Sequence, residues 1–254
     1  MFVKKVLVVI PARYESTRFP GKPLASILGK SMISRVYSQV EKCKRVDEVL
    51  VATDHSAIFE HVKSWNGNVV MTATNHNNGT ERIGEAISDY PDYDLIINVQ
   101  GDEPLINPEQ IDALIQSMHE NKDIIATQCL KISEATELFD YNVVKLVKSK
   151  SNKALYFSRQ AIPALRDEPY RDWFMKGDFY RHIGIYGFDR TTLFELLKLP
   201  ESSLESLEKL EQLRWLENDF PISVYVTQYR SLGVDRPEGV ATIESILQAT
   251  GIES

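Results

Sequence analysis

Three cationic side chains lie close together near the N-terminus, in a segment that cannot form regular secondary structure. Arg13, Arg18 and Lys22 occur within residues 11–24, where only one residue is acidic. Three prolines in this segment remove backbone donors and fix φ, and Gly21 allows a sharp bend. Two guanidinium groups, one ammonium group and backbone N–H groups together suit a polyphosphate. A solvated surface loop is the alternative, and the position after an apolar strand favours phosphate binding.

Carboxylates form a second group of candidate functional residues. Asp102 and Glu103 follow the apolar residues 95–99, separated from them only by Gln100 and Gly101. Mg²⁺ is typically held by one or two carboxylates together with substrate phosphates, and Asp102 is well placed to be one of them. Acidic residues beside Gly and Pro are also ordinary turn chemistry. Because both loops should open on the same edge of one sheet, we favour the metal site.

Arg82 ends a polar segment, residues 72–82, and is a further candidate. Thr80 could cap a helix that begins there, which would place Arg82 in its first turn. The helix dipole disfavours a cation in that position. Arg82 therefore either faces an anionic ligand or is a surface arginine, and the pattern does not separate the two.

The elements that position these residues alternate between apolar and amphipathic stretches. This alternation is typical of parallel βαβ units, in which ligands bind outside the carboxyl ends of the strands. Helices are expected from residue 31 to 43, from 54 to 62, over 108–119 and 203–217, and after Asp235, which could be an N-cap. The expected strands are residues 6–10, 49–52, 69–71, 95–99, 124–127, 143–147, 182–188 and 222–226.

The second half of the chain offers weaker signals. Residues 163–177 have no clear period and form either a mobile flap over a site or a surface excursion. His182 lies in an expected strand without a second His or Cys nearby, which is typical of a structural histidine. Glu211 and Gln212 lie on the expected helix 203–217, where ligand contact competes with ordinary solvent exposure. The leucines of this helix repeat every three residues, so the apolar stripe wraps around it and a second subunit could cover part of it.

Composition excludes several classes of protein. The net charge of −7 disfavours a general nucleic-acid or membrane-surface binder. Cys43 and Cys129 belong to no ligand-spaced cluster and suggest neither a zinc site nor a disulfide framework. No apolar run reaches membrane-spanning length and no signal h-region opens the chain, so a cytosolic protein is expected. The chain lacks a Walker loop, a Gly-x-Ser-x-Gly elbow and a dinucleotide fingerprint.

The motifs together resemble those of one enzyme family, the 3-deoxy-manno-octulosonate (Kdo) cytidylyltransferases, over nearly the whole chain. The opening loop alone would indicate only a nucleotidyltransferase, and the later motifs narrow the resemblance to Kdo activation. The matching stretches are residues 10–14, Arg18 and 20–24, then 51–54 (Val-Ala-Thr-Asp), 79–82 (Gly-Thr-Glu-Arg), 98–104 (Asn-Val-Gln-Gly-Asp-Glu-Pro), 155–159, 162–163, 181–186 (Arg-His-Ile-Gly-Ile-Tyr), 207–214 and 233–235.

The resemblance implies an α/β fold and a reaction. The fold would be a mainly parallel mixed sheet flanked by helices, similar to nucleotide-diphospho-sugar transferases and Rossmann-like. A single domain would cover residues 1–254, with a smaller sugar-binding and dimerisation lobe at about 153–217. The enzyme would join CTP and Kdo to give CMP-Kdo and pyrophosphate for lipopolysaccharide synthesis. It would act as a cytoplasmic homodimer, with no nucleic-acid partner and no membrane insertion.

The resemblance also implies roles for individual residues. The catalytic residues would be Arg13, Lys22, Asp102 and Asp235, and the two aspartates would bind Mg²⁺. CTP would be bound by Ala12, Arg13, Arg18, Lys22, Arg82 and Gln100. The sugar site would be lined by Arg159, Arg166, His182, Tyr186, Glu211 and Gln212, with arginine suited to the sugar carboxylate.

Two departures from the family pattern are visible. The family commonly has Thr-Pro-Glu-Asp after the second metal aspartate, whereas residues 236–239 are Arg-Pro-Glu-Gly. Arg166 lies in a segment that varies within the family.

Other functions remain open at this stage. The enzyme could act on 8-amino-8-deoxy-Kdo, since one substituent changes few contacts. Sialic acid enzymes usually have a glycine-rich first loop, unlike residues 14–17 here. A non-catalytic nucleotide-sugar sensor is disfavoured by the presence of Lys22, Asp102 and Asp235 together.

Overall fold

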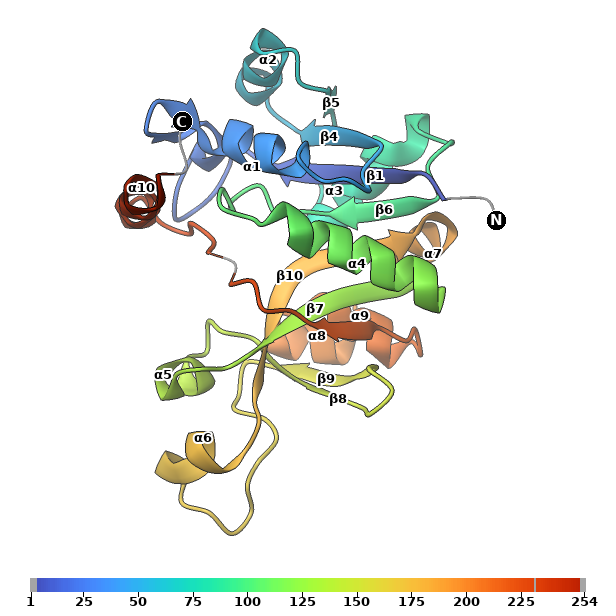
Figure 1. Ribbon diagram of the computed structural model, residues 1–254. Coiled ribbons are helices and arrows are strands. Elements are labelled where there is room, and N and C mark those ends of the chain that lie inside the picture. The colour runs from blue at the N-terminus through green and yellow to red at the C-terminus, as the bar shows by residue number, and fades with distance from the viewer. Residues whose placement is uncertain (1–3, 231, 252–254) are drawn as a thin grey trace. The chain divides into compact units, whose positions relative to one another are not determined.

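The computed structural model describes residues 4–230 and 232–251. The chain divides into two compact units (Figure 1). The first consists of Met1–Gln116 with Ser231–Ser254, and the second of Ser117–Arg230. The smaller lobe expected at residues 153–217 lies within the second unit. No helix in residues 4–230 and 232–251 is both long and apolar enough to cross a membrane.

The first unit contains parallel strands in the order β6-β1-β4-β5. Their bounds are β1 Val6–Ala12, β4 Glu48–Thr53, β5 Val69–Met71 and β6 Leu95–Asn98. Val6 to Ile10 are at most 1% exposed, as expected for an apolar strand that is covered on both faces. The covering helices α1 (Met32–Val40) and α3 (Gly79–Ala86) lie in front of and behind β1 in Figure 1.

A small apolar core brings the C-terminal segment to this sheet. Ile27, Met32, Val234, Ile243 and Leu247 form a buried cluster. Its members come from β2 (Ser26–Ile27), α1, the segment before the last helix, and that helix itself, α10 (Glu238–Thr250). Burial of Val234 fixes the position of its neighbour Asp235 in the first unit. Asp235 is not the N-cap of α10, since the cap residue is Pro237.

The remaining elements of the first unit connect these parts. They are η1 (Lys22–Leu24), β3 (Lys30–Ser31), α2 (Ser56–Ser64) and η2 (Ile87–Asp89), and α4 (Pro108–Asn121) continues across the unit boundary. The N-cap of α2 is His55, whose side chain accepts a hydrogen bond from the Ala57 N–H group.

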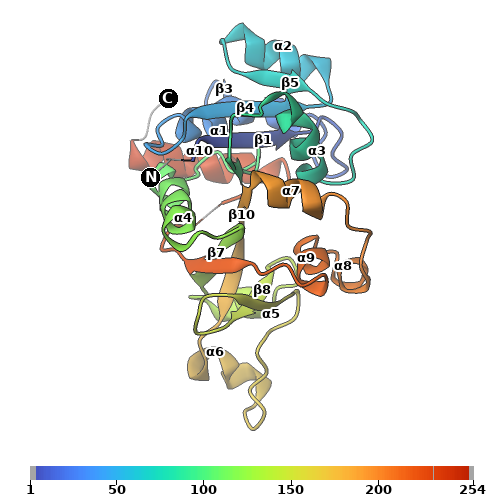
Figure 2. The same ribbon diagram turned by 90° about the vertical axis from the view of Figure 1, so that its right-hand side faces the viewer.

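The second unit has mixed strand directions (Figure 2). β11 is parallel to β7, whereas β10 is antiparallel to both β7 and β8, and β8 is antiparallel to β9. The strands are β7 Ile125–Lys131, β8 Lys145–Lys148, β9 Ala154–Ser158, β10 Tyr180–Asp189 and β11 Ser223–Val226. The helices are α5 Ala135–Phe139, η3 Tyr170–Asp172, α6 Trp173–Lys176, α7 Arg190–Leu196, α8 Ser203–Glu208 and α9 Gln212–Glu217.

The expected single helix over residues 203–217 is wrong. Lys209 adopts a left-handed conformation with φ of 53° and ends α8, and α9 starts afresh at Gln212. The leucine stripe is accordingly split, because Leu207 is 80% exposed while Leu213 is fully buried.

Residues 163–177 pack against other parts of the second unit. Trp173 and Phe174 pack against the buried residues Ile132, Leu138 and Phe179. The Trp173 indole also donates to the Glu168 carbonyl at 3.0 Å. This segment therefore has its own small apolar core within the second unit.

Candidate active site

One cavity in the first unit lies at the carboxyl ends of β1 and β6, where the sequence predicts ligand binding. Its volume is about 340 Å³. Four segments line it: the end of β1 with the loop that follows, residues 76–82, residues 100–102, and Asp235. All the residues predicted to bind CTP or metal line this cavity: Ala12, Arg13, Arg18, Lys22, Arg82, Gln100, Asp102 and Asp235.

The basic loop folds back on itself around Tyr14. Gly21 adopts a left-handed conformation with φ of 67°, and its N–H group donates to the Tyr14 carbonyl at 2.9 Å. Lys22 then starts the short helix η1. Glycine adopts this left-handed conformation without steric cost, and the turn places Lys22 in the wall of the cavity.

The loop that carries Asp102 approaches β1 closely. A Cβ atom on Gly101 would lie 2.9 Å from the Pro11 carbonyl oxygen, which is too close for any side chain. Only glycine allows this approach, and it places the next residue, Asp102, at the floor of the cavity.

Lys22 is held between two carboxylates. Its ammonium nitrogen lies 2.5 Å from Asp102 Oδ2 and 3.8 Å from Asp235 Oδ1. The Val234 N–H group donates to the Asp102 carbonyl at 2.9 Å, which ties the two aspartate segments together. Arg18 adds a second cation, 3.1 Å from Asp235 Oδ1.

This donor set suits a magnesium ion. Two carboxylates from distant segments converge on one cation, so the same oxygens can approach a divalent ion in its place. No group of three or more His, Cys, Asp or Glu side chains within the described ranges could hold a metal. Mg²⁺ uses one or two carboxylates and takes its other ligands from water and phosphate, so the two carboxylates beside Lys22 fit it.

Arg82 is not the surface arginine that the sequence left possible. It is 3% exposed and lines the cavity. Its Nη2 donates to Asp54 Oδ2 at 2.7 Å, and its Nη1 donates to Thr72 Oγ1 at 2.5 Å. The cap of α3 is Asn78 rather than Thr80, since the Asn78 side chain accepts from the Glu81 N–H group at 2.8 Å.

Two of the residues predicted to bind the sugar lie close together on β10 of the second unit, Tyr186 buried and His182 partly buried. The His182 and Tyr186 rings lie 5.2 Å apart on β10. The Thr127 hydroxyl lies 2.9 Å from His182 Nε2 and 2.7 Å from the Ile185 carbonyl. Because its one hydrogen goes to a carbonyl, the hydroxyl accepts from Nε2–H, which leaves His182 Nδ1 as an acceptor.

Tyr186 has a hydroxyl group without a partner. The residue is 7% exposed, and its OH forms no hydrogen bond within the part of the chain that the structure describes. Burial raises the pKa of this phenol well above its usual value, and the charge of Glu211 adds to the effect. A buried donor that lacks a partner is costly unless a ligand supplies one.

Gln212 is also buried and follows Glu211 at the start of α9.

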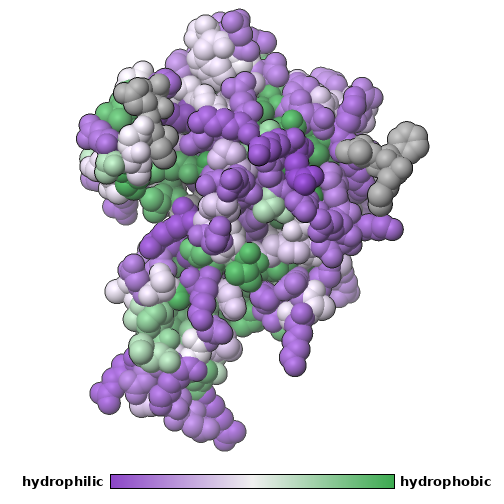
Figure 3. Space-filling view, in the orientation of Figure 1, coloured by the Kyte–Doolittle hydropathy of each residue, from purple (hydrophilic) through white to green (hydrophobic). Residues whose placement is uncertain are grey.

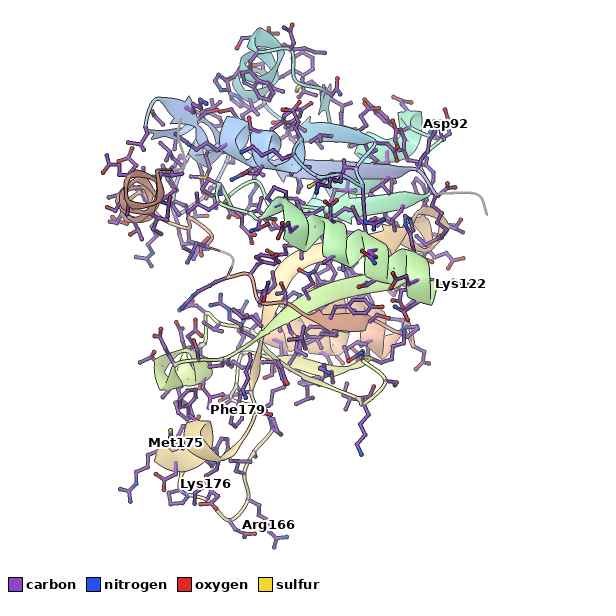
Figure 4. The ribbon with its side chains drawn as sticks, in the orientation of Figure 1. Asp92, Lys122, Arg166, Met175, Lys176 and Phe179 are labelled. Carbon is purple, nitrogen blue, oxygen red and sulfur yellow. The ribbon has the colours of Figure 1, made fainter. Side chains whose placement is uncertain are left out.

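Arg159 and Arg166 differ sharply in their surroundings. The Arg159 guanidinium donates to the carbonyls of Glu208, Lys209 and Tyr141 at 2.8–3.3 Å. Arg166 has a side chain that is 94% exposed, and its guanidinium lies 3.9 Å from Asp167 (Figure 4). The structure therefore does not bring Arg166 together with the other predicted sugar residues.

We expect the free energy of unfolding to decrease as the pH is lowered from neutral, because of His182. Burial lowers the pKa of His182 from 6.5 to about 3, and the charge of Arg181 contributes. Between these values the unfolded chain binds a proton that the folded chain does not, so stability is lost as pH falls. The loss at pH 5 should be on the order of 1–2 kcal/mol. Urea unfolding of the wild type and of His182→Gln at pH 7 and pH 5 measures it. A parallel decline in both proteins would contradict this assignment.

Asp54 is the functional candidate that the sequence analysis missed. It contacts both Arg82 and the backbone of Tyr14, although it does not itself line the cavity. Its position could have indicated this role, because Asp54 follows β4 directly and lies at the same edge of the sheet as the basic loop.

Comparisons with known proteins give a consistent result. A family model described as "Cytidylyltransferase" matches residues 7–224. A 3-deoxy-manno-octulosonate cytidylyltransferase of Parabacteroides distasonis is 46% identical over 239 residues, which cover 92% of this chain and 94% of the relative. The enzyme of the same name from Thermodesulfovibrio yellowstonii is 45% identical, covering 95% of this chain and 97% of the relative.

A solved structure is similar over almost the whole chain. It is described as CMP:2-keto-3-deoxy-manno-octonic acid synthetase complexed with CTP. Its TM-score is 0.90 at 37% identity, covering 97% of this chain and 99% of that one. This similarity confirms the expected fold class, a mixed, mostly parallel sheet flanked by helices. The chain belongs to the cytidylyltransferase family, and within it to the 3-deoxy-manno-octulosonate cytidylyltransferases.

Proposed function

We propose that this protein transfers CMP from CTP to the anomeric hydroxyl of Kdo, giving CMP-Kdo and pyrophosphate. The observation that carries the proposal is the cavity at the carboxyl ends of β1 and β6. It gathers Arg13, Arg18 and Lys22 beside two carboxylates on an otherwise acidic chain. The relative of known structure that is described as complexed with CTP, and the curated relatives named for Kdo, support the choice of substrates.

The chemistry needs positioning and charge rather than a protein nucleophile. The Kdo hydroxyl attacks the α-phosphorus of CTP in line, and pyrophosphate leaves from the opposite side. Arg13, Arg18 and Lys22 neutralise the phosphate charge that shifts to the leaving group. Arg82 and Gln100 contact the nucleotide, and the backbone at Ala12 allows its close approach.

Asp102 and Asp235 would hold Mg²⁺. A bound magnesium ion supplies Lewis-acid neutralisation of phosphate charge. Lys22 now neutralises these two carboxylates. With Mg²⁺ bound there, its ammonium group would instead be available to the phosphate oxygens of CTP.

The second unit supplies the proposed sugar site. The Arg159 guanidinium donates only to neutral carbonyls and forms no ion pair within residues 4–230 and 232–251, so its charge is available to the Kdo carboxylate. The Tyr186 hydroxyl and His182 Nδ1 supply one donor and one acceptor for sugar hydroxyls. Glu211 and Gln212 complete this set. Arg166 could contribute only if its segment moves.

We further propose a cytoplasmic homodimer that serves lipopolysaccharide synthesis. Hydrophilic residues cover most of the face shown in Figure 3, and apolar residues appear there in smaller groups. Within residues 153–217 the second unit nevertheless exposes Leu207 (80%) and Leu155 (61%). A second copy of the chain would remove such side chains from water, which supports assigning dimerisation to the lobe at residues 153–217.

Pyrophosphate release tests the proposed function. We expect pyrophosphate release from CTP to require both Mg²⁺ and Kdo, because the metal neutralises phosphate charge and the sugar supplies the attacking hydroxyl. Kdo and 8-amino-8-deoxy-Kdo are offered in parallel, with ATP, GTP and UTP as nucleotide controls. Preference for the amino sugar would keep the reaction but change the substrate. No release with any acidic sugar would contradict catalysis and favour a nucleotide-sugar sensor.

A further inference from the structure

Asp54 contacts two separate parts of the cavity wall. It follows β4, and its side chain is 12% exposed. One carboxylate oxygen, Oδ1, accepts from the Tyr14 N–H group in the basic loop at 3.3 Å. The other oxygen, Oδ2, accepts from Arg82 Nη2 at the start of α3 at 2.7 Å. One side chain therefore bridges the loop that carries Lys22 and the helix that carries Arg82.

Asp54 and its neighbours fix the orientation of the Arg82 guanidinium. Arg82 Nη1 donates to Thr72 Oγ1 and, at 3.2 Å, to the Ala73 carbonyl. Thr72 is itself oriented by the Thr53 carbonyl, to which its hydroxyl donates at 3.1 Å. These bonds hold one end of the planar guanidinium, and because its donors form a rigid fork, they determine where the remaining N–H groups point.

The same carboxylate anchors the basic loop through Tyr14. The Tyr14 ring stacks on His55 with a centroid distance of 4.0 Å and an interplanar angle of 17°. A Cβ atom on Gly21 would lie 3.5 Å from this ring, so the ring packs directly beneath the turn that precedes Lys22. Tyr14 is thus held through its ring, its carbonyl and, by Asp54, its N–H group.

We propose that Asp54 is a positioning residue that couples the phosphate-binding loop to Arg82 and so sets the affinity for the nucleotide. A carboxylate suits this task because both of its oxygens accept, whereas an amide offers only one acceptor. Asp54→Asn can therefore satisfy Tyr14 or Arg82, but not both. The inference deepens the proposed function and rests on it, since it assumes that the cavity binds CTP.

Calorimetric titration of CTP with Mg²⁺, without sugar, tests this role. We expect Asp54→Asn to weaken CTP binding by about 10–100-fold, as for a buried charge that loses its partner. The KM for Kdo at saturating CTP should stay at the wild-type value, which a general structural defect would not allow. A CTP dissociation constant within about twofold of the wild type would overturn the proposal.

Coupling to Arg82 is tested by a double-mutant cycle. Arg82→Gln alone should weaken CTP binding, and adding Asp54→Asn to it should then have an effect of no more than about threefold. Independent, multiplicative effects would show that Asp54 does not act through Arg82. Thr72→Val keeps the side-chain shape and should weaken binding in the same direction, which provides a test if Asp54→Asn fails to fold.

Asp47→Asn is the matched control. Asp47 is an aspartate of the first unit that is exposed but likewise accepts from a backbone N–H group, that of Val6 at 2.7 Å, at the opposite end of β1. Its substitution should lower the melting temperature without changing CTP affinity. If the wild type bound no CTP, the proposed function itself would fail. If the wild type bound CTP and Asp54→Asn bound it equally well, only the positioning role would fail.

Discussion

Asp102→Asn should reduce turnover by about 100-fold or more, because it removes a charge that holds the metal. The substitution keeps the shape of the side chain and leaves Asp235 as the single carboxylate beside Lys22. Its clearest consequence should be a rise in the magnesium concentration needed for half-maximal activity. Steady-state pyrophosphate release across a range of MgCl₂ concentrations measures both effects.

The same substitution at Asp92 is the control for Asp102→Asn. Asp92 is an exposed residue of the first unit and lies outside the cavity (Figure 4). Asp92→Asn removes the same charge and should leave turnover and magnesium dependence unchanged. If Asp102→Asn retained the wild-type magnesium dependence, Asp102 would not be a metal ligand, whatever its effect on rate.

Sequence patterns alone predicted which strands and loops form this site. The apolar residues 6–10 were predicted as a buried strand with the basic loop at its end, and this placement is confirmed. The expectation that residues 11–24 contain no regular structure is wrong at both ends, because β1 extends to Ala12 and residues 22–24 form the short helix η1. The same reasoning placed Asp102 after β6. These predictions succeeded because they depend on local composition and on the rule that ligands bind at the carboxyl ends of parallel strands.

Other features of the site depend on tertiary contacts, which the local sequence pattern does not predict. Asp235 lines the cavity because its neighbour Val234 packs in a core with Ile27 and Leu247. The residues around Asp235 in the sequence do not predict this packing. Asp54 stands at the start of the expected helix 54–62, but the N-cap of α2 is His55, and the Asp54 carboxylate accepts from Arg82 instead. The break at Lys209 was invisible for a different reason, since neither Gly nor Pro marks it.

Arg159→Ala should raise the KM for Kdo by about 10–100-fold, the effect of losing one charge-assisted contact to a carboxylate. CTP affinity should stay unchanged, because Arg159 lies in the second unit and does not line the cavity of the first. The variant should also lose stability, since three backbone carbonyls lose their donor. Separate measurements of the two KM values and of the melting temperature distinguish these effects.

Lys153→Ala separates sugar binding from stability. Lys153 is another cation of the second unit that is held by hydrogen bonds, 2.9 Å from Asp123 and 2.5 Å from the Ser223 hydroxyl. Its removal should lower the melting temperature while leaving the KM for Kdo at the wild-type value. A rise in the KM for Kdo that is confined to Arg159→Ala would then reflect ligand binding rather than the loss of a stabilising cation. If both variants raised the KM for Kdo equally, or if Arg159→Ala weakened CTP and Kdo to the same extent, Arg159 would be a structural residue, and the carboxylate of the sugar would have to be bound elsewhere.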